Sequence, residues 1–469
     1  MKKSKMKDVS EPNMLTDMFP HSIPPRTVFD EPIHEVFEGE IVTIQPLEIR
    51  ERDIHITDTT FRDGQQARPP YTVDQIVQLF DLLSRLSGPQ GVIRQTEFFL
   101  YSRKDKEAIS KCLERGYQYP EITGWIRAEK SDLSLVENMG LKETGILTSC
   151  SDYHIFMKMR LDRRRAFDRY TGLVKEALSK GIRPRCHLED ITRADMDGFV
   201  IPLVQELMCI SEEVDDSMKV KIRLCDTMGF GISYPGSALP RSVPKLVLSM
   251  LRKAGVPSER LEWHGHNDFH RVLINGTTAW LYGCNALNCT LLGIGERTGN
   301  PPLEGALIEY IGLKGDMCGI DTMVITEIAS YYRSIGTKIS ARYPFVGDDF
   351  HKTRAGIHAG GLARDERIYS IFDTAKLLGR PPEVVVTDKG GTDAVQMWVN
   401  NFLGLHHGDK VRKTRVAKIM RWVTDQYEVE KRTTAISDRE MAELVKKHLP
   451  EQYEAAVKEG RLARSYPED

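Results

Sequence analysis

Short apolar stretches alternate with longer segments of helical periodicity along most of the chain. From Arg52 onward, runs rich in β-branched and aromatic residues each precede a segment whose apolar residues recur every three to four positions. The predicted strands lie at 54–57, 95–100, 121–126, 143–148, 183–188, 220–225, 261–266 and 286–292. The predicted helices lie at 73–86, 104–115, 133–139, 163–179, 198–213, 243–254, 272–282 and 302–313. Eight strand–helix units over about 260 residues fit a (β/α)₈ TIM barrel better than an open doubly wound sheet.

The segments on either side of these units have a different character. Residues 1–50 are rich in Lys, Pro and Glu and contain one partly β-like stretch at 36–44. We expect an N-terminal extension that packs on the surface or onto a partner subunit. The predicted organisation is an extension at 1–50, a barrel domain at 51–325, and a mainly helical linker and subdomain region at 326–469.

Composition narrows the class of protein without identifying it. The chain has 469 residues, of which 41% are hydrophobic and 28% charged, with a formal net charge of −2. This balance is typical of a soluble globular protein and gives no indication of nucleic-acid or membrane binding. The eight cysteines include no C-x-x-C pair, and we find neither a signal peptide nor an apolar run of membrane length. We therefore expect buried thiols and a cytoplasmic location.

Two histidines in the seventh predicted strand indicate half of a metal site. Alternate residues of a strand share one face, so His264 and His266 point into the same space. Asn267 and Asp268 follow where the strand becomes a loop. An isolated pair of this kind is more often incidental than functional, so the prediction depends on ligands at other strand ends.

Polar clusters follow several other predicted strands. Barrel enzymes build their sites at the carboxyl ends of the strands, which makes these positions informative. The clusters are residues 58–66 after the first strand, 189–193 after the fifth, 226–229 after the sixth and 293–300 after the eighth. Asp63 and Asn300 would add oxygen ligands to the two imidazoles. Such a mixed shell suits Mn²⁺, Co²⁺, Zn²⁺ or Fe²⁺, with positions open to a chelating substrate.

Each cluster also has a purely structural interpretation. Arg62 and Asp63 could form an ion pair at the barrel rim, and Asp226 with Thr227 could cap a helix. The glycines at 293–299 do not have the spacing of the dinucleotide-binding fingerprint. The occurrence of all these polar clusters at successive strand ends favours a functional site over the structural interpretations.

These five segments, in this order, resemble the metal-dependent barrel family that contains isopropylmalate, homocitrate and citramalate synthases and 3-hydroxy-3-methylglutaryl-CoA lyase. The resemblance covers about residues 52–400. It implies that Asp63, His264 and His266 are metal ligands, with Asn300 at or near the shell. It also implies that Arg62 stabilises an enolate or carbonyl oxygen. Glu296 matches a glutamate behind the metal ligands, which we count among the catalytic residues.

Residues 354–361 extend the resemblance beyond the barrel. They are similar to a Ser-Gly-Ile-His segment that the condensing enzymes have and the lyase lacks, which favours synthesis over cleavage. In those synthases the histidine lies on a linker subdomain that reaches into the partner's barrel. The resemblance therefore implies a homodimer in which His358, together with Tyr369, serves the neighbouring site. His358 could instead be a structural loop histidine beside Gly360 and Gly361.

The implied reaction is condensation of acetyl-CoA with a 2-oxo acid, followed by thioester hydrolysis. This is the work of an acyltransferase that converts the acyl group to an alkyl group. A divalent metal ion, with Mn²⁺ or Co²⁺ favoured and Zn²⁺ or Mg²⁺ possible, would polarise the keto group. The general base would be His358, assisted by Glu296 or Tyr369. The residues expected to bind substrate are Arg62, Arg127, Glu189, Arg193 and Thr227.

The chain most resembles the citrate-forming members of the family, which use oxaloacetate. Arg127 could pair with the distal carboxylate of that substrate. Phe98, Phe99 and Tyr101 would equally furnish an apolar pocket for a branched 2-oxo acid, so homocitrate or 2-isopropylmalate synthesis is the alternative. A biotin-dependent carboxyltransferase shares the barrel and the histidine pair, but its lysine pattern is not evident. A non-catalytic barrel would be expected to have lost ligands.

The sequence departs from the family pattern in two places. Gln65 stands where the family has a glutamate, which removes one carboxylate beside the metal. The chain also ends about 70 residues after the linker region, too soon for the domain that confers leucine feedback. A basic stretch at 410–418 is interpreted as a solvated helical face.

Overall fold

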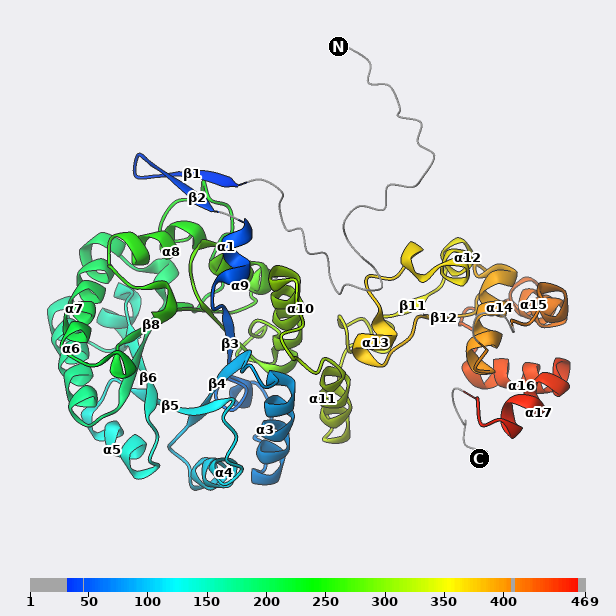
Figure 1. Cartoon of the computed structure of the whole chain (residues 1–469), viewed down its shortest axis with the longest axis horizontal. Coiled ribbons are helices and arrows are strands. Elements are labelled where there is room, and N and C mark those ends of the chain that lie inside the picture. The colour runs from blue at the N-terminus through cyan, green and yellow to red at the C-terminus, as the bar shows by residue number, and fades with distance from the viewer. Residues whose placement is uncertain (1–31, 45, 406–409, 463–469) are drawn as a thin grey trace, which may run out of the picture. The chain divides into compact units, whose positions relative to one another are not determined.

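The protein has two compact units that divide the chain between Ile328 and Ala329. The computed structural model describes residues 32–44, 46–405 and 410–462. The first unit is a barrel preceded by a β-hairpin, and the second is mainly helical (Figure 1). The predicted extension up to residue 31 lies outside the described residues.

Eight parallel strands close into a barrel, in the order β10-β3-β4-β5-β6-β7-β8-β9. They are β3 (His55–Asp58), β4 (Ile93–Phe99), β5 (Glu121–Arg127), β6 (Glu143–Ser149), β7 (Arg183–Glu189), β8 (Lys221–Asp226), β9 (Leu261–Gly265) and β10 (Ala286–Cys289). The predicted (β/α)₈ architecture is confirmed. The eighth strand is shorter than predicted because residues 291–293 form a 3₁₀ turn, in which Leu292 has a φ of 55°.

Helices surround the barrel, one after each strand (Figure 1). They are α3 (Val73–Ser87), α4 (Arg103–Leu113), α5 (Lys130–Asn138), α6 (Arg163–Ser179), α7 (Ile201–Glu212), α8 (Val243–Arg252), α9 (Val272–Tyr282) and α10 (Leu303–Lys314). The sequence of α3 shows why they form. Thr72 and Gln75 make a reciprocal capping box at its start, and Gly88 ends it with a φ of 66°. Its apolar side chains are buried against the strands.

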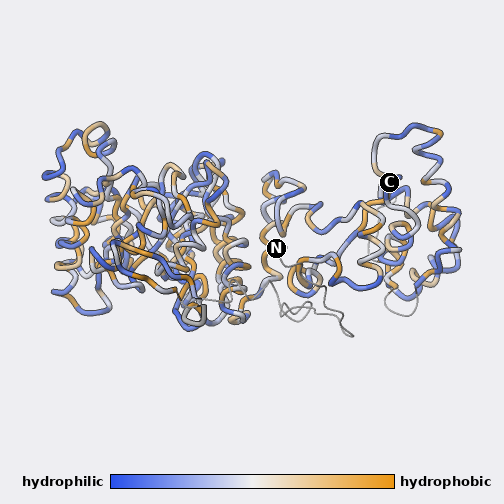
Figure 2. Tube along the Cα trace, turned by 90° about the horizontal axis from the view of Figure 1, so that it is seen from above, coloured by the Kyte–Doolittle hydropathy of each residue, from blue (hydrophilic) through white to orange (hydrophobic). Residues whose placement is uncertain are grey.

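The two faces of the strands differ sharply in chemistry. Side chains that face the helices are apolar and buried, such as Leu224 and Trp263. Neighbouring positions point into the barrel and are charged, as Arg223 and Glu262 show. Alternation along the strand thus places an apolar layer outside and an ionic layer inside. Figure 2 shows hydrophobic and hydrophilic residues interspersed along the chain of the barrel.

The ionic layer inside the barrel is closed on itself. Arg223 Nε lies 2.7 Å from Glu262 Oε2, and Arg223 Nη1 lies 3.1 Å from Glu97 Oε1. Arg185 Nη2 lies 2.5 Å from Glu143 Oε1. Burial alone would raise the pKa of Glu262, but Arg223 and Arg185 outweigh it and lower that pKa to about 2.

A hairpin precedes the barrel. Strand β1 (Ile33–Phe37) pairs antiparallel with β2 (Glu40–Ile44), where the sequence predicted a β-like stretch. Phe37 and Val42 are buried, and Glu35 accepts a 2.5 Å hydrogen bond from Tyr282 of α9. The short helix α1 (Pro46–Glu51) then leads into β3.

The second unit contains two short parallel strands and several helices. The strands are β11 (Lys352–Thr353) and β12 (Glu383–Val384). The helices are α12 (Gly356–Arg364), α13 (Thr374–Leu378), α14 (Gly391–Phe402), α15 (Lys413–Glu428), α16 (Asp438–His448) and α17 (Pro450–Lys458), and α11 (Met323–Ser334) connects from the first unit. Val399 of α14, Ile419 of α15 and Val445 of α16 meet in its core. The predicted mainly helical C-terminal region is confirmed.

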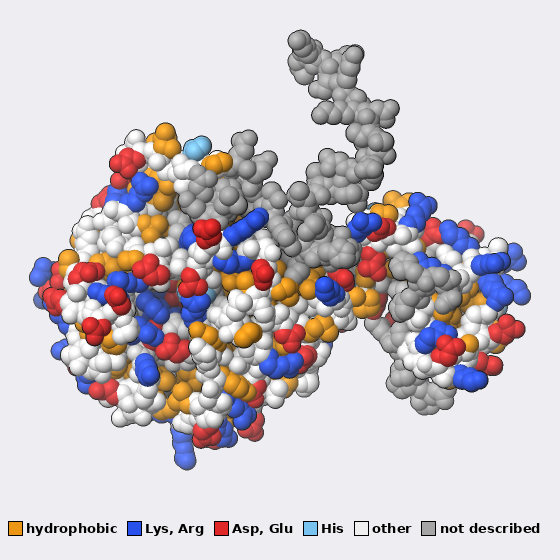
Figure 3. Space-filling view, in the orientation of Figure 1, with side chains coloured by type: hydrophobic (Ala, Val, Ile, Leu, Met, Phe, Trp, Pro, Cys, Tyr) orange, Lys and Arg blue, Asp and Glu red, His pale blue; other side chains and the backbone are white. Residues whose placement is uncertain are grey.

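The surface is mixed in charge. Basic and acidic side chains are interspersed over the visible face of the barrel (Figure 3). No helix in the described part of the chain is long and apolar enough to cross a membrane. All eight cysteines are free, and the expectation that they are buried is wrong only for Cys209 of α7, which is exposed.

Candidate metal centre

The turn after β3 is shaped by a buried carboxylate. Asp58 accepts hydrogen bonds from the hydroxyl groups of Thr60, at 2.5 Å, and Thr96, at 2.6 Å. Burial raises the pKa of Asp58 to about 6. Because its oxygens are occupied by Thr60 of the turn and Thr96 of β4, Asp58 has a structural role. The turn carries Arg62 and then Asp63, the first residue of the one-turn helix α2 (Asp63–Gln66).

Asp63, His264 and His266 form a buried group whose ligand atoms all lie within 4.8 Å of one another. The Nε2 atoms of His264 and His266 lie 3.4 and 4.0 Å from Asp63 Oδ2. Both histidines come from the carboxyl end of β9, and Asp63 follows β3, so the closing of the barrel brings them together. The predicted metal-ligand triad is therefore present.

A partner behind His264 fixes which nitrogen faces this group. His264 Nδ1 lies 2.8 Å from Asn288 Oδ1, which requires a hydrogen on Nδ1 and leaves the Nε2 lone pair directed at Asp63. Asn288 in turn donates to Thr57 Oγ1 at 2.9 Å. Burial lowers the pKa of His264 to about 3 and also lowers that of His266. Both imidazoles are accordingly neutral, the form that binds metals.

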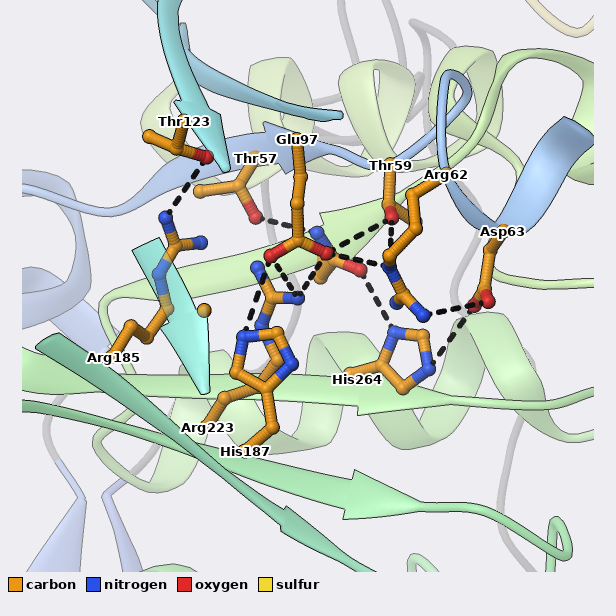
Figure 4. Close-up of polar contacts among 12 residues, drawn as sticks. Thr57, Thr59, Arg62, Asp63, Glu97, Thr123, Arg185, His187, Arg223 and His264 are labelled. Atoms are coloured by element: carbon orange, nitrogen blue, oxygen red, sulfur yellow. Dashed lines mark hydrogen bonds and ion pairs between the residues drawn. The ribbon is translucent and has the colours of Figure 1, made fainter. Parts of the chain in front are cut away.

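Arg62 connects the triad to the charged layer beneath it (Figure 4). Its Nη1 lies 2.9 Å from Asp63 Oδ1 and its Nε lies 2.6 Å from Glu97 Oε1. Burial would raise the pKa of Asp63, but the positive charge of Arg62 outweighs it and keeps that pKa low. Nη2 of Arg62 makes no hydrogen bond to a described residue. The ion pair between Arg62 and Asp63 that the sequence suggested is present, and it leaves the Nη2 donor of the guanidinium available to a ligand.

The loop after β10 places its two predicted site residues differently. Asn300 is buried, and its Nδ2 lies 3.0 Å from Asp63 Oδ2, which puts this side chain directly against the triad. Glu296 is exposed on the rim. Its carboxylate makes no hydrogen bond or ion pair with a described residue, so its catalytic role stays a prediction.

Glu189, Thr227 and Arg193 lie at the ends of neighbouring strands on the same rim. Glu189 lies 2.9 Å from His154 Nδ1 and 2.6 Å from Lys158 Nζ. Burial would raise the pKa of Glu189, but these two contacts outweigh it and lower that pKa to about 2. Thr227 accepts a 2.8 Å hydrogen bond from the Asp190 amide, and Arg193 pairs with Asp190 at 2.8 Å. Their predicted contacts with substrate stay predictions.

Arg127 is not brought to the triad. Its guanidinium lies 2.9 Å from Asp132 and over the ring of Tyr101, and its side chain is 61% exposed. The hydroxyl of Tyr101 also donates to Asp132 at 2.8 Å. The existing partner Asp132 therefore competes with any substrate carboxylate.

His358 and Tyr369 both belong to the second unit. Their rings stack with centroids 3.9 Å apart and planes inclined by 14°. The sequence resemblance paired these two residues for catalysis, and the structure places them in direct contact with each other. Their predicted action on the barrel site stays a prediction.

Several residues near the triad were missed from the sequence. Glu97 contacts Arg62, Arg223 and, at 3.3 Å, Nε2 of His187 (Figure 4). His187 is buried, and its Nε2 has no hydrogen bond to a described residue. A Cβ atom on Gly145 would come within 2.6 Å of its ring, so Gly145 makes room for the imidazole. Alternation of side chains along β4 and β7 was the sequence signal that could have placed Glu97 and His187 inside the barrel.

The triad fits a divalent metal ion. One carboxylate and two neutral imidazoles, all buried and directed at one point, are a usual donor set for catalytic metals that keep positions open to substrate. The hydrogen bond from His264 to Asn288 supplies the outer support that such ligands commonly have.

A model of the HMGL-like family matches residues 53–331, so the chain belongs to this family of barrel proteins, and the family predicted from the motifs is confirmed. Over 95% of its length the chain is 55% identical to a Citrate (Re)-synthase of Syntrophus aciditrophicus (strain SB), covering 69% of that protein. It is 50% identical over 95% of its length to a Citrate (Re)-synthase of Clostridium kluyveri, covering 96% of it. A 2-phosphinomethylmalate synthase of Streptomyces hygroscopicus is 35% identical over 93% of the chain, with 96% of it covered.

Proposed function

We propose that the protein is a citrate (Re)-synthase, which condenses acetyl-CoA with oxaloacetate and hydrolyses the thioester to give citrate and free CoA. The observation that carries this proposal is the buried triad of Asp63, His264 and His266 beside Arg62. It lies at the barrel mouth of a chain that is 50–55% identical to two citrate (Re)-synthases.

Asp63, His264 and His266 would hold the metal ion, with Mn²⁺ or Co²⁺ favoured over Zn²⁺ or Mg²⁺. When bound, the ion supplies Lewis acidity toward the keto oxygen of the 2-oxo acid. The neutral histidines need not lose a proton to bind it, because the pKa of His264 is about 3. Asn300 supports the Asp63 carboxylate through its amide.

Arg62 offers its unoccupied Nη2 to the oxygen that becomes negative as the new carbon–carbon bond forms. Glu97 and Asp63 hold the other side of the guanidinium at 2.6 and 2.9 Å. The donor is thus oriented before substrate arrives, which is the usual basis of electrostatic stabilisation in active sites. Thr227, Glu189 and Arg193 line the rim and orient the 2-oxo acid.

His358 is the general base that removes a methyl proton from acetyl-CoA, and its stacking on Tyr369 holds the imidazole. Glu296 assists from the rim. We propose that residues 326–469 contribute to a homodimer in which His358 serves the partner's barrel. We also propose that the protein acts in the cytoplasm.

The assay that tests this function measures thiol release from acetyl-CoA with a panel of 2-oxo acids and identifies the product. We expect oxaloacetate to be preferred and citrate to accumulate. Comparable kcat/KM for 2-oxoisovalerate would contradict the proposal, and a preference for 2-oxoglutarate would indicate homocitrate synthesis. We expect discrimination of several orders of magnitude if Arg127 leaves Asp132 to pair with the distal carboxylate of oxaloacetate, which 2-oxoisovalerate lacks.

Mixing inactive protomers tests the shared site. His264→Ala and His358→Ala proteins should each be inactive alone but should regain part of the activity when mixed, because one hybrid site keeps both groups. Absence of recovery after verified subunit exchange would place His358 in its own barrel or outside the site.

A further inference from the structure

A cavity of about 510 Å³ lies within the second unit, beside the stacked pair of His358 and Tyr369. This is within the size range of small-molecule sites, roughly 300–1,000 Å³. Its walls come from the segment around β11, from α12, from the loop that carries Tyr369 and from the start of α13. Apolar side chains make up much of the lining, including Phe350, Leu362 and Ile371.

Two polar groups in the lining lack partners. Thr374 is 4% exposed, and its hydroxyl has no hydrogen bond to a described residue. The His351 side chain is 6% exposed; its Nε2 lies 3.5 Å from Glu383, while its Nδ1 has no hydrogen bond to a described residue. Buried polar groups are normally hydrogen-bonded, and leaving one unpaired destabilises the protein. Both side chains line the cavity, so a ligand there would satisfy them.

The lining specifies the chemistry of the ligand. Apolar walls with a hydroxyl and an imidazole suit a narrow, mostly uncharged chain that carries hydrogen-bonding groups. No acidic residue is among the described lining residues, and Lys352 is the one lining residue with a full positive charge. Oxaloacetate and citrate, with two and three carboxylates, fit this lining poorly. The arm of acetyl-CoA, which has two amides and a gem-dimethyl group, fits it well.

We propose that this cavity binds the pantetheine arm of acetyl-CoA. The inference rests on the proposed function, because it takes the substrate from the citrate synthase reaction. Thr374 and His351 hydrogen-bond the amides, and Phe350, Leu362 and Ile371 pack on the methyl groups. Tyr369 borders the cavity and stacks on His358, so an arm lying there brings its thioester end toward the imidazole that removes the methyl proton.

The test compares two thioester substrates in the metal-loaded, full-length enzyme. Acetyl-CoA carries the arm and the nucleotide, whereas S-acetylpantetheine carries the arm alone. Thr374→Val removes the hydroxyl with little change in shape. We expect it to raise the KM for both thioesters by the same factor, about three- to tenfold for one hydrogen bond. The KM for oxaloacetate and the kcat should stay near the wild-type values.

His351→Gln is the second variant, and it should raise the same two KM values if the imidazole hydrogen-bonds the pantetheine arm. Thr424→Val is the matched control, because Thr424 lies in α15 outside the cavity and its hydroxyl already donates to Met420. Thermal unfolding checks that all three proteins are folded.

The outcomes separate the arm from its alternatives. Equal KM increases for both thioesters support the proposal. An increase for acetyl-CoA alone would assign the cavity to the nucleotide end, and unchanged KM values in both variants would show that it binds neither. Each of these results overturns the proposal while wild-type citrate formation still stands. A wild-type enzyme that forms no citrate would instead refute the function, and the inference with it.

Discussion

The inside of the barrel and its carboxyl-terminal mouth use the same residue types in different ways. Inside, Arg223 contacts Glu97 and Glu262, and Arg185 contacts Glu143, so that each charge has a counter-charge. At the mouth, His264 directs an unshared Nε2 at Asp63, and Nη2 of Arg62 has no partner among the residues that the structure describes. The two layers meet at Glu97, which binds both Arg223 and Arg62.

This difference distinguishes residues that hold the site in position from residues that can bind a ligand. A charge with all its partners already in place has little left to offer a ligand, and it fixes the position of what lies above it. A buried group with an unused lone pair or donor can bind a metal ion or a substrate oxygen. On this account the ionic layer inside the barrel orients the residues at the mouth through Glu97, and only the residues at the mouth bind metal and substrate.

The largest expected effect comes from removing a ligand at the mouth. Asp63→Ala should abolish metal binding and lower kcat by at least about three orders of magnitude, because a bound metal ion contributes several kcal/mol to the transition state. The thermal unfolding midpoint should change little. Metal analysis and steady-state rates measure this, with Asp74→Ala as the control, since Asp74 lies on α3 with a 94% exposed side chain. A normal metal content in Asp63→Ala would remove Asp63 from the site.

Breaking the closed layer should instead reduce stability. Arg223→Met removes the closest counter-charge of buried Glu262 and one of the two arginines that contact Glu97, which costs about 3–5 kcal/mol in free energy of unfolding. The control is Arg85→Met, whose exposed pair with Glu327 should contribute less than about 1 kcal/mol. Urea denaturation compares the two. Equal losses in both variants would show that the inner layer is not a special source of stability.

A smaller effect is expected one step behind the metal ligands. Asn288→Ala removes the acceptor for His264 Nδ1 and frees the imidazole to rotate. We expect metal affinity to fall by about 10- to 100-fold, as for other groups that orient a metal ligand. Calorimetric titration with Mn²⁺ measures the affinity, with the exposed Asn138→Ala as control. An unchanged affinity in Asn288→Ala would mean that packing alone orients His264.

The smallest effect concerns pH. Burial lowers the pKa of His264 from 6.5 to about 3 and also lowers that of His266, so protons do not compete with the metal ion at neutral pH. Protonation of His264 should therefore change metal affinity by less than about twofold between pH 7.5 and 5.5. A histidine with an ordinary pKa of about 6.5 would lose roughly tenfold in affinity over this interval. A loss of that size would show that the triad is more hydrated than its burial implies.

Much of the barrel could be predicted from its sequence. Regular alternation of strand and helix patterns indicated eight units, and parallel strands in a closed barrel necessarily bring their carboxyl ends together. Asp63 and His264, 201 positions apart in the sequence, could thus be assigned to one site. The family resemblance then supplied the roles of Arg62 and Asn300.

The supporting residues could not be predicted in this way. Arg185 and Arg223 occupy alternate positions of strands, a pattern that is equally typical of a solvent-facing sheet, and only barrel closure puts them inside. Alternation along the strands predicts that Asn288 and His187 point into the barrel, but it does not record which side chains they meet there. The contact of Arg127 with Asp132, five residues later, also has no signal in the sequence, and the predicted role of Arg127 in substrate binding stays a prediction.

The most direct test of the account titrates metal back into stripped protein while citrate formation is measured. We expect no citrate from acetyl-CoA and oxaloacetate after chelation, then a rate that rises with added Mn²⁺ and levels off at one ion per chain. Asp63→Ala should stay inactive throughout the titration. Full citrate formation by the metal-free protein, or saturation that does not depend on Asp63, would contradict the claim that the open group at the barrel mouth is the catalytic metal centre.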